Sequence, residues 1–458
     1  MSHVLKNGTL VLPTGLKRAD LLLENGKIAQ MGPNLMGDTQ LDCTGKLIFP
    51  GFIDTHTHFD MNKGLPNQTA DDFATGTAAA VVGGTTSILD FSCQDKGHTL
   101  MEAVDTWHSR ADGVSSCHYG FHMSILDWNE ETRKELPLMT REGITSYKIY
   151  FAYDNLRVSD AVAYEVISAV AQEGGIVGNH CENGDLVNEG IRRELALGHL
   201  SPAAHPHARP DYVEAEAVCR WLSISEAAGV PVNIVHLSTK RGLNLVREAR
   251  ARGQKFYVES CPQYLLLNDD KYLLPGFESA KFVLSPPLRA KADSDALWSA
   301  LTDGNIDTIG TDHCSFNFDG VKTLGRDNFS KIPNGIPGTE HRPALLYTYG
   351  VGGGHITEVQ LCKLLAENPA KLFGMYPQKG VLALGSDGDI TVWDPDYRWT
   401  ISAQNQTQAA DYTPFEGMEV TGRADTVFLN GTPVVENGKL TSQNKGEYLK
   451  RHAVNFWR

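Results

Sequence analysis

A pair of histidines follows a short apolar run near the beginning of the chain. The run from Leu47 to Ile53 is typical of a buried strand, and it leads into His56-Thr57-His58. Because side chains alternate between the two faces of a strand, residues two apart point the same way. Imidazole nitrogens are common metal ligands, so the pair could hold one ion at a strand end. Such pairs also occur without a metal, and the hypothesis therefore needs further ligands elsewhere.

Further residues with ligand chemistry follow other strand-like runs. They are Lys148, His180 in Asn-His-Cys-Glu-Asn, His236 in Val-His-Leu-Ser and Asp312 in Gly-Thr-Asp-His-Cys. Four imidazoles and a carboxylate exceed the three protein ligands that a catalytic zinc ion usually keeps. They suit two metal ions, which need an anionic group between the two cations. The predicted metal-binding set is His56, His58, Lys148, His180, His236 and Asp312.

The place of the expected bridge is occupied by a lysine. The run around Lys148 contains no Asp or Glu. An ammonium beside two metal cations is electrostatically unfavourable. A neutral lysine amine that has taken up carbon dioxide becomes a carbamate, a two-oxygen anion that can bridge two metals. The alternative is a lysine whose stem is buried and whose ammonium reaches solvent.

The elements that must position these residues alternate through the middle of the chain. Helical patterns separate strand-like segments at 49–54, 86–91, 117–123, 146–152, 175–179, 231–236, 256–261 and 307–311. The helical patterns cover 72–82, 100–111, 160–172, 212–228 and 240–251. Eight strands alternating with helices predict a (β/α)8 barrel of the TIM type, an α/β fold whose active site lies at the carboxyl ends of the strands. The rival is an open doubly wound sheet, but no Gly-rich fingerprint follows the first strand.

The two ends of the chain have a different texture. Residues 3–50 alternate apolar and polar positions between turns such as Asn7-Gly8 and Asn25-Gly26, which indicates short antiparallel strands. The same texture returns around 389–393 and 420–435. We therefore predict a small β-sandwich domain built from residues 1–50 and 376–458, with the barrel, residues 51–375, inserted between them.

Composition limits the function classes. The 458 residues carry a net charge of −14, which argues against nucleic acid or an anionic membrane as partner. No apolar run approaches the length of a membrane span, and we expect no membrane association. Eight scattered cysteines without a Cys-x-x-Cys pair indicate reduced, buried thiols and a cytoplasmic protein.

Longer motifs resemble those of the dihydropyrimidinase and D-hydantoinase group of the amidohydrolase superfamily. The motifs span nearly the whole chain and are Gly51-Phe-Ile-Asp-Thr-His-Thr-His58, His180-Cys-Glu-Asn-Gly-Asp185, Cys261-Pro-Gln-Tyr-Leu265, Leu284-Ser-Pro-Pro-Leu-Arg289, Thr311-Asp-His-Cys314, Ile332-Pro-Asn-Gly335 and Gly380-Val-Leu-Ala-Leu-Gly-Ser-Asp-Gly-Asp389. The resemblance implies hydrolysis of a small cyclic amide, two zinc ions (with Mn²⁺ or Co²⁺ as alternatives) and N6-carboxylated Lys148. It also suggests a homotetramer or a homodimer.

The resemblance implies a role for each metal ligand. His56, His58 and Asp312 hold one metal ion, His180 and His236 hold the other, and carboxylated Lys148 bridges them. A hydroxide shared by the two zinc ions attacks the ring carbonyl, because the cations lower the pKa of bound water. Asp312 takes its proton as general base and returns it to the leaving ring nitrogen as general acid.

Other residues are implied to bind the substrate. Tyr153 matches a tyrosine that donates to the oxyanion, although it could instead pack its loop. Ser285 and Asn334 match contacts to the amide edge of the ring, although both could instead form turns. Apolar residues near the metal site are expected to form a wall beside a hydrogen or hydrocarbon substituent of the ring; these are Met61, Leu65 and Phe151. The predicted substrates are dihydropyrimidines and 5-monosubstituted hydantoins, with the D-enantiomer preferred, and the products are N-carbamoyl amino acids.

Two other readings remain open. Dihydroorotase and allantoinase share the metal ligands, but they typically carry an Arg or Asn with Glu-Pro-Gly soon after the His-x-His, which 59–66 lacks. A non-catalytic, dihydropyrimidinase-related interaction protein would have lost metal ligands, whereas every ligand is present here.

Several histidines are expected to play no part in metal binding. His205 and His207 lie in a proline-broken loop, and His118 and His122 are expected to pack or hydrogen-bond inside the barrel. His313 follows Asp312 and must point away from it, so it can only support the site from behind.

Overall fold

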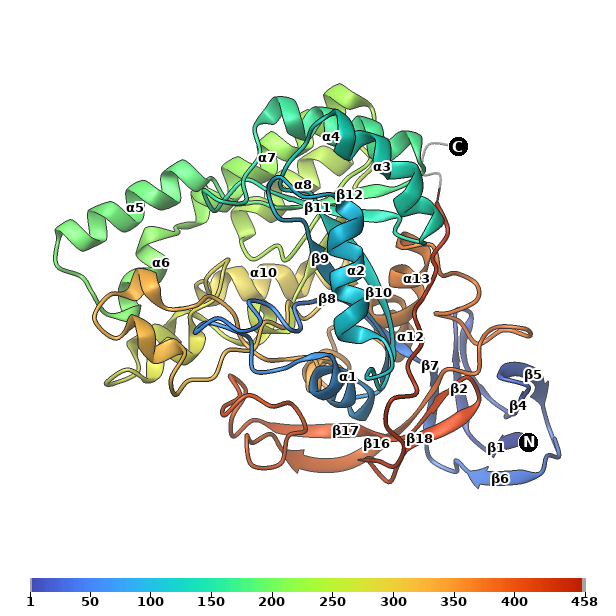
Figure 1. Ribbon diagram of the computed structural model, residues 1–458. Helices are drawn as coiled ribbons and strands as arrows, with labels where there is room; N and C mark the ends of the chain where they lie inside the picture. Colours follow the sequence, from blue (N-terminus) through green and yellow to red (C-terminus); the bar gives the residue numbers. More distant parts are fainter. Residues whose placement is uncertain (1, 455–458) are drawn as a thin grey trace.

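A closed barrel of eight parallel strands forms the centre of the protein in a computed structural model that describes residues 2–454 (Figure 1). The strands run in sequence order: β8 (Phe52–Thr57), β9 (Thr85–Cys93), β10 (His118–Ser124), β11 (Ser146–Tyr150), β12 (Ile176–His180), β13 (Asn233–Ile234), β14 (Tyr257–Ser260) and β15 (Thr308–Ile309). Closure comes from a bridge between Thr57 and His313, beside a bond from the His58 N–H to the His313 carbonyl. The predicted α/β barrel is confirmed.

Helices cover the outside of the barrel (Figure 1). The longer ones are α1 (Phe73–Val82), α2 (Leu100–Ala111), α3 (Glu130–Arg141), α4 (Asp160–Gln172), α5 (Gly184–Ala196), α7 (Asp211–Ala228), α8 (Lys240–Ala251) and α10 (Lys291–Thr302). Polar residues fix where they begin: Asp72 and Thr99 each form a capping box at the start of α1 and α2. The five predicted helices are all present, within a residue at each end. Among residues 2–454, no helix combines the length and apolar character that crossing a membrane requires.

The first apolar run is two strands rather than one. β7 (Leu47–Pro50) pairs with β2 and β16 in a separate sheet, and β8 begins the barrel two residues later. Gly51 lies between them, and a Cβ there would lie 2.0 Å from the Thr86 hydroxyl oxygen. A larger residue would therefore force the first two barrel strands apart. Proline and glycine together end one strand and let the chain change sheets.

Two smaller sheets are built from segments near both ends of the chain (Figure 1). The four-stranded sheet contains β1 (His3–Lys6), β4 (Asp20–Glu24), β5 (Lys27–Gly32) and β6 (Thr39–Asp42), and the seven-stranded sheet contains β2 (Thr9–Leu12), β3 (Gly15–Arg18), β7, β16 (Ile390–Thr400), β17 (Glu419–Leu429), β18 (Thr432–Glu436) and β19 (Lys439–Leu440). Leu5, Leu21, Ile48, Val392 and Phe428 share one apolar core between the two sheets. The domain division at residues 50 and 375 stays a prediction.

The expectation of purely antiparallel terminal strands is wrong in two places. β1 pairs with β6 and β2 pairs with β7 in parallel, because longer connections bring the chain back in the same direction. Beyond β19 the chain returns to the barrel, where Gly446 and Leu449 bond to the backbone of Ser115 and Tyr119. The last described residues therefore belong to the amino-terminal end of the barrel.

Candidate active site

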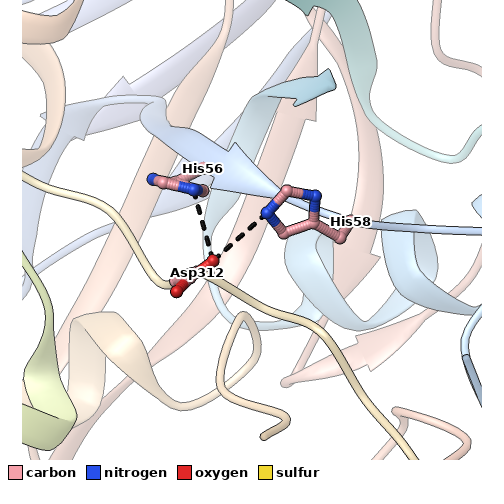
Figure 2. A group of neighbouring side chains, drawn as sticks. All are labelled: His56, His58 and Asp312. Atoms are coloured by element: carbon pink, nitrogen blue, oxygen red, sulfur yellow. Dashed lines mark ion pairs between the residues drawn. The ribbon is translucent and has the colours of Figure 1, made fainter. Parts of the chain in front are cut away.

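Three of the predicted metal ligands meet at the carboxyl end of the barrel (Figure 2). His56 and His58 come from β8, and Asp312 follows β15, which lies beside β8 in the closed barrel. One carboxylate oxygen of Asp312 lies 3.2 Å from Nε2 of His56 and 3.2 Å from Nε2 of His58. Their ligand atoms all lie within 4.8 Å of one another. This is a group of donors that could hold a metal ion.

Lys148 extends from β11 into the same group. Its Nζ lies 3.1 Å from Nε2 of His56 and 4.6 Å from the centre of the Phe91 ring. The side chain is buried, and among residues 2–454 no carboxylate lies within ion-pair distance of its Nζ. Burial lowers the pKa of the Lys148 amine. The alternative interpretation, in which the Lys148 ammonium reaches solvent, is therefore wrong.

His180 and His236 complete the ring of ligands. Their ring centres lie 4.6 Å apart, and His236 lies 5.5 Å from His56. The structure thus brings all six predicted metal ligands to one rim of the barrel, as the strand ends predicted. Tyr153 lies on the open side of this group, with its ring centre 5.2 Å from that of His180.

Two buried carboxylates support the histidines from behind, and the sequence reasoning missed both. Glu259 on β14 lies 2.6 Å from Nδ1 of His56 and accepts a hydrogen bond from Thr55. Glu182 lies 2.8 Å from Nε2 of His180. Each carboxylate fixes one ring nitrogen, and the other nitrogen of His56 faces Lys148 in the site. For Glu259, no spacing or periodicity in the sequence marks it as the partner of His56, which lies 203 positions away.

The surroundings of Asp312, His56 and His236 shift their pKa values toward the protonation states that can bind a metal ion. Burial alone would raise the pKa of Asp312, but the neighbouring His56 and other imidazoles hold it well below its usual range. Burial lowers the pKa of His56 well below its usual value, and the nearby Lys148 lowers it further. Burial likewise lowers the pKa of His236, together with the neighbouring His180. These shifts favour an ionised Asp312 and uncharged His56 and His236.

Three site residues have left-handed backbone conformations. The φ angles are 67° at Tyr153, 41° at His236 and 53° at Asp312. Residues other than glycine rarely adopt this region, and strain of this kind concentrates at functional sites. Each residue lies two or three positions after the end of a strand, and all three line the cavity at the barrel mouth. No local sequence pattern predicts the left-handed conformation of these three residues.

A cavity of about 1360 Å³ opens above the candidate ligands. Ser285 and Asn334 both line it, as do the predicted wall residues Met61 and Leu65. Leu65 is 55% exposed, so it forms part of the mouth rather than the floor. The cavity is large enough for a small ring with a substituent.

The prediction for Phe151 is wrong. Its ring is buried against Trp221, 5.8 Å between ring centres, and it does not line the cavity. Lys148 and Tyr150 point inward. Because side chains alternate along a strand, the next residue, Phe151, points outward. Tyr150 and Leu156 line the cavity in its place.

Tyr153 is suited to donate a hydrogen bond. Burial raises the pKa of its phenol, which therefore keeps its proton at neutral pH. The guanidinium of Arg209 lies 5.5 Å from the centre of its ring and also binds Glu182 at 2.6 Å. This arrangement links the positions of Tyr153 and His180.

The remaining histidines lie outside the ligand group. His122 bonds to Ser146 and to the Thr55 carbonyl inside the barrel. His118, at the amino-terminal end of β10, accepts a hydrogen bond from the Glu447 N–H. His313 points away from Asp312 and bonds to Asp71 at 3.0 Å. His205 donates to the Leu284 carbonyl at 2.7 Å, so it supports the backbone beside Ser285.

The fold and the site together define a barrel enzyme with a candidate metal centre at the carboxyl ends of its strands. Residues 47–434 match the amidohydrolase family, and the chain belongs to that family.

Individual relatives narrow the class. The chain is 42% identical to a D-hydantoinase of Geobacillus stearothermophilus over 98% of this chain and 97% of the relative. A D-phenylhydantoinase of Escherichia coli is 37% identical over 98% of each chain. The structure of a dihydropyrimidinase from Brevibacillus agri has a TM-score of 0.97 at 41% identity, covering 99% of each chain. The protein is therefore an enzyme of the D-hydantoinase and dihydropyrimidinase group, a hydrolase of cyclic amides, and the reading as a non-catalytic relative is wrong.

Proposed function

We propose that this enzyme hydrolyses the ring amide of dihydropyrimidines and 5-monosubstituted hydantoins, preferring the D-enantiomer. Water is added across the C–N bond, so the carbonyl carbon becomes a carboxylate and the ring nitrogen gains a proton, giving an N-carbamoyl amino acid. The observation that carries the proposal is that Tyr153 and five of the six predicted ligands line one cavity, with the sixth, His56, directly beside them. The D-preference rests on the names of the relatives.

The donor set fits two divalent metal ions, which we propose to be zinc, with Mn²⁺ or Co²⁺ as alternatives. His56, His58 and Asp312 would hold one ion, and His180 and His236 would hold the other. Lys148 would bridge them as a carbamate. The buried Lys148 amine has no carboxylate partner among residues 2–454 and faces an imidazole nitrogen at 3.1 Å, so conversion to an anion removes an unfavourable buried cation.

The metals supply a lowered pKa for the attacking water and polarise the substrate carbonyl. Asp312 would accept the proton of that water and return it to the ring nitrogen as the C–N bond breaks. Asp312 has a left-handed φ of 53° and lines the cavity beside the other predicted ligands.

Groups on the cavity wall would orient the ring. Tyr153 would donate its phenolic proton to the oxygen of the attacked carbonyl, where negative charge develops. Ser285 and Asn334 would meet the amide edge of the ring, mainly through backbone groups. Met61 and Leu65 would face the ring substituent, with Tyr150 and Leu156 in the place predicted for Phe151.

Dihydroorotate is expected to be a poor substrate. It adds a carboxylate to the ring, and a buried carboxylate needs a cationic partner. Lys63 lines the cavity, but its side chain is 56% exposed and pairs with Asp60 at 2.9 Å, so we propose that it stays solvated and does not serve this purpose. We expect turnover on dihydroorotate to be lower by roughly 10²-fold or more, since an unpaired charge costs several kcal/mol.

The test measures kcat/KM on dihydrouracil, hydantoin, each enantiomer of a 5-aryl hydantoin, allantoin and dihydroorotate. The proposal expects the first two compounds and the D-aryl hydantoin to be turned over well. Comparable rates on dihydroorotate and dihydrouracil would assign the protein to the dihydroorotase-like enzymes, and a preference for allantoin would assign it to the allantoinases.

Replacing Glu259 by glutamine is expected to weaken metal binding by roughly 10- to 100-fold, because a weaker acceptor then holds Nδ1 of His56. The shape of the side chain is kept, so the fold should remain. Competition with a chelator measures metal retention, and Glu278→Gln, at an exposed ion pair, is the matched control. Equal retention in the two variants would contradict the supporting role of Glu259.

The remaining proposals concern the enzyme in the cell. We propose a cytoplasmic enzyme that forms a homotetramer or a homodimer. All eight cysteines have free thiols, which supports a reducing compartment. Light scattering of the purified protein would measure the oligomeric state.

A further inference from the structure

A second buried lysine lies close to the cavity without belonging to the metal group. Lys322 begins the short helix η4 (Lys322–Gly325), and its side chain is fully buried. Among residues 2–454, no carboxylate lies within ion-pair distance of its Nζ. Burial lowers the pKa of this amine to about 7. Burying a lysine without a counter-ion is unfavourable, so the side chain needs a compensating role.

The Lys322 amine bonds to two backbone carbonyls from different segments. Its Nζ donates to the carbonyl of Val283 at 2.7 Å and to that of Pro333 at 3.1 Å. The Gly335 N–H donates to the same Val283 carbonyl at 3.1 Å. Lys322 thus joins the two segments at the point where they already touch.

These two segments carry the residues that would contact the ring. Ser285 lies two residues after Val283, and Asn334 directly follows Pro333. Both line the cavity. His205 also donates a hydrogen bond to the first segment, at the Leu284 carbonyl. The separation of Ser285 and Asn334 therefore depends on the carbonyls that Lys322 binds.

We propose that Lys322 is a positioning residue, which holds segments 283–285 and 333–335 at the spacing that the amide edge of the substrate requires. The proposal rests on the proposed function for the contacts that Ser285 and Asn334 make. An amine on a four-carbon stem can reach both carbonyls at once, whereas an apolar side chain of the same length removes this donor from the Pro333 carbonyl and leaves the Val283 carbonyl with the Gly335 N–H alone. Within residues 2–454, the Lys322 amine bonds to the Val283 and Pro333 carbonyls and to none of the predicted metal ligands, so its action does not pass through the metals.

The kinetic signature follows from this role. Ser285 and Asn334 would hold the ring in both the bound substrate and the transition state. Losing such uniform binding raises KM and leaves kcat nearly unchanged. A general loss of structure would instead lower the active fraction, and therefore kcat, together with the metal content.

The experiment compares Lys322→Met with Lys291→Met, which removes an exposed lysine paired with Asp295 on α10. For Lys322→Met, we expect KM for dihydrouracil to rise about tenfold or more, with kcat within about threefold of wild type and unchanged metal content. The Lys291→Met variant should match wild type. An unchanged KM in Lys322→Met, or a fall in kcat at constant KM, overturns the proposal.

A second measurement does not depend on turnover. The Gly335 N–H should exchange with deuterium faster in Lys322→Met, because its acceptor segment is less restrained. If the wild type were inactive on cyclic amides, the proposed function would fail. Exchange at Gly335 would still test whether Lys322 holds segments 283–285 and 333–335 together. Unchanged exchange overturns it. Should Lys322→Met not fold, Lys322→Gln, which can reach only one carbonyl, takes its place with the same expected directions and the same overturning results.

Discussion

Replacing Lys148 by alanine is expected to remove most of the bound metal and to lower turnover by roughly 10³-fold or more. Among residues 2–454, no carboxylate comes within ion-pair distance of the Lys148 amine, so no neighbouring acid can take over as the bridge. Its loss would leave two cations without an anion between them. The alanine also leaves the rest of β11 intact, so the fold should be kept.

The measurements are metal content per chain, turnover of dihydrouracil and the intact mass of the protein. A wild-type mass increased by one carbon dioxide, absent in the variant, is the expected result. Lys134→Ala, which removes an exposed lysine on α3, should change none of these values. A metal-loaded, active enzyme with an unmodified Lys148 would contradict the bridging role.

The ligand group was predictable because it depends on short-range geometry. His56 and His58 share a face through strand alternation; Lys148 lies within β11, His180 ends β12, and Asp312 follows β15 by three residues. Parallel strands in a closed barrel bring those ends to one rim. Recognising the strand ends was therefore sufficient to place the ligands together.

The Phe151 error has a local cause. Tyr150 ends β11 facing the cavity, and the next residue turns toward the surrounding helices. Hydrophobic character alone suggested a wall residue, whereas alternation carried one position beyond the strand would have excluded it. The division of 47–57 into β7 and β8 was missed in a similar way, because Pro50 and Gly51 interrupt an otherwise continuous apolar run.

Contacts between distant segments could not be predicted from the sequence. Glu259 supports His56 from across the barrel, and Lys322 joins backbone carbonyls at positions 283 and 333. Neither residue has a spacing or periodicity that separates it from ordinary acidic or basic positions. The left-handed conformation of Asp312 belongs with them, since tertiary contacts rather than a glycine impose it.

Asp312→Asn is the variant that separates metal binding from proton transfer. Asparagine has nearly the same shape and keeps an oxygen that can face His56 and His58, both 3.2 Å from the present carboxylate. We therefore expect the fold to remain and part of the metal to be retained. An amide cannot accept the proton of the attacking water, so turnover should fall by roughly 10²-fold or more.

Metal content and kcat measured on the same preparation give the decisive comparison. If proton transfer is the main role of Asp312, the fall in kcat per bound metal pair should remain about 10²-fold after correction for the metal that is lost. A fall that disappears on this correction would make Asp312 a ligand only, and near-wild-type turnover would move the proton transfer to another group. Asp319→Asn, at an exposed position seven residues further along the chain, controls for the loss of one negative charge. It should leave both measurements unchanged, because Asp319 bonds through its backbone to Asp411 and does not line the cavity.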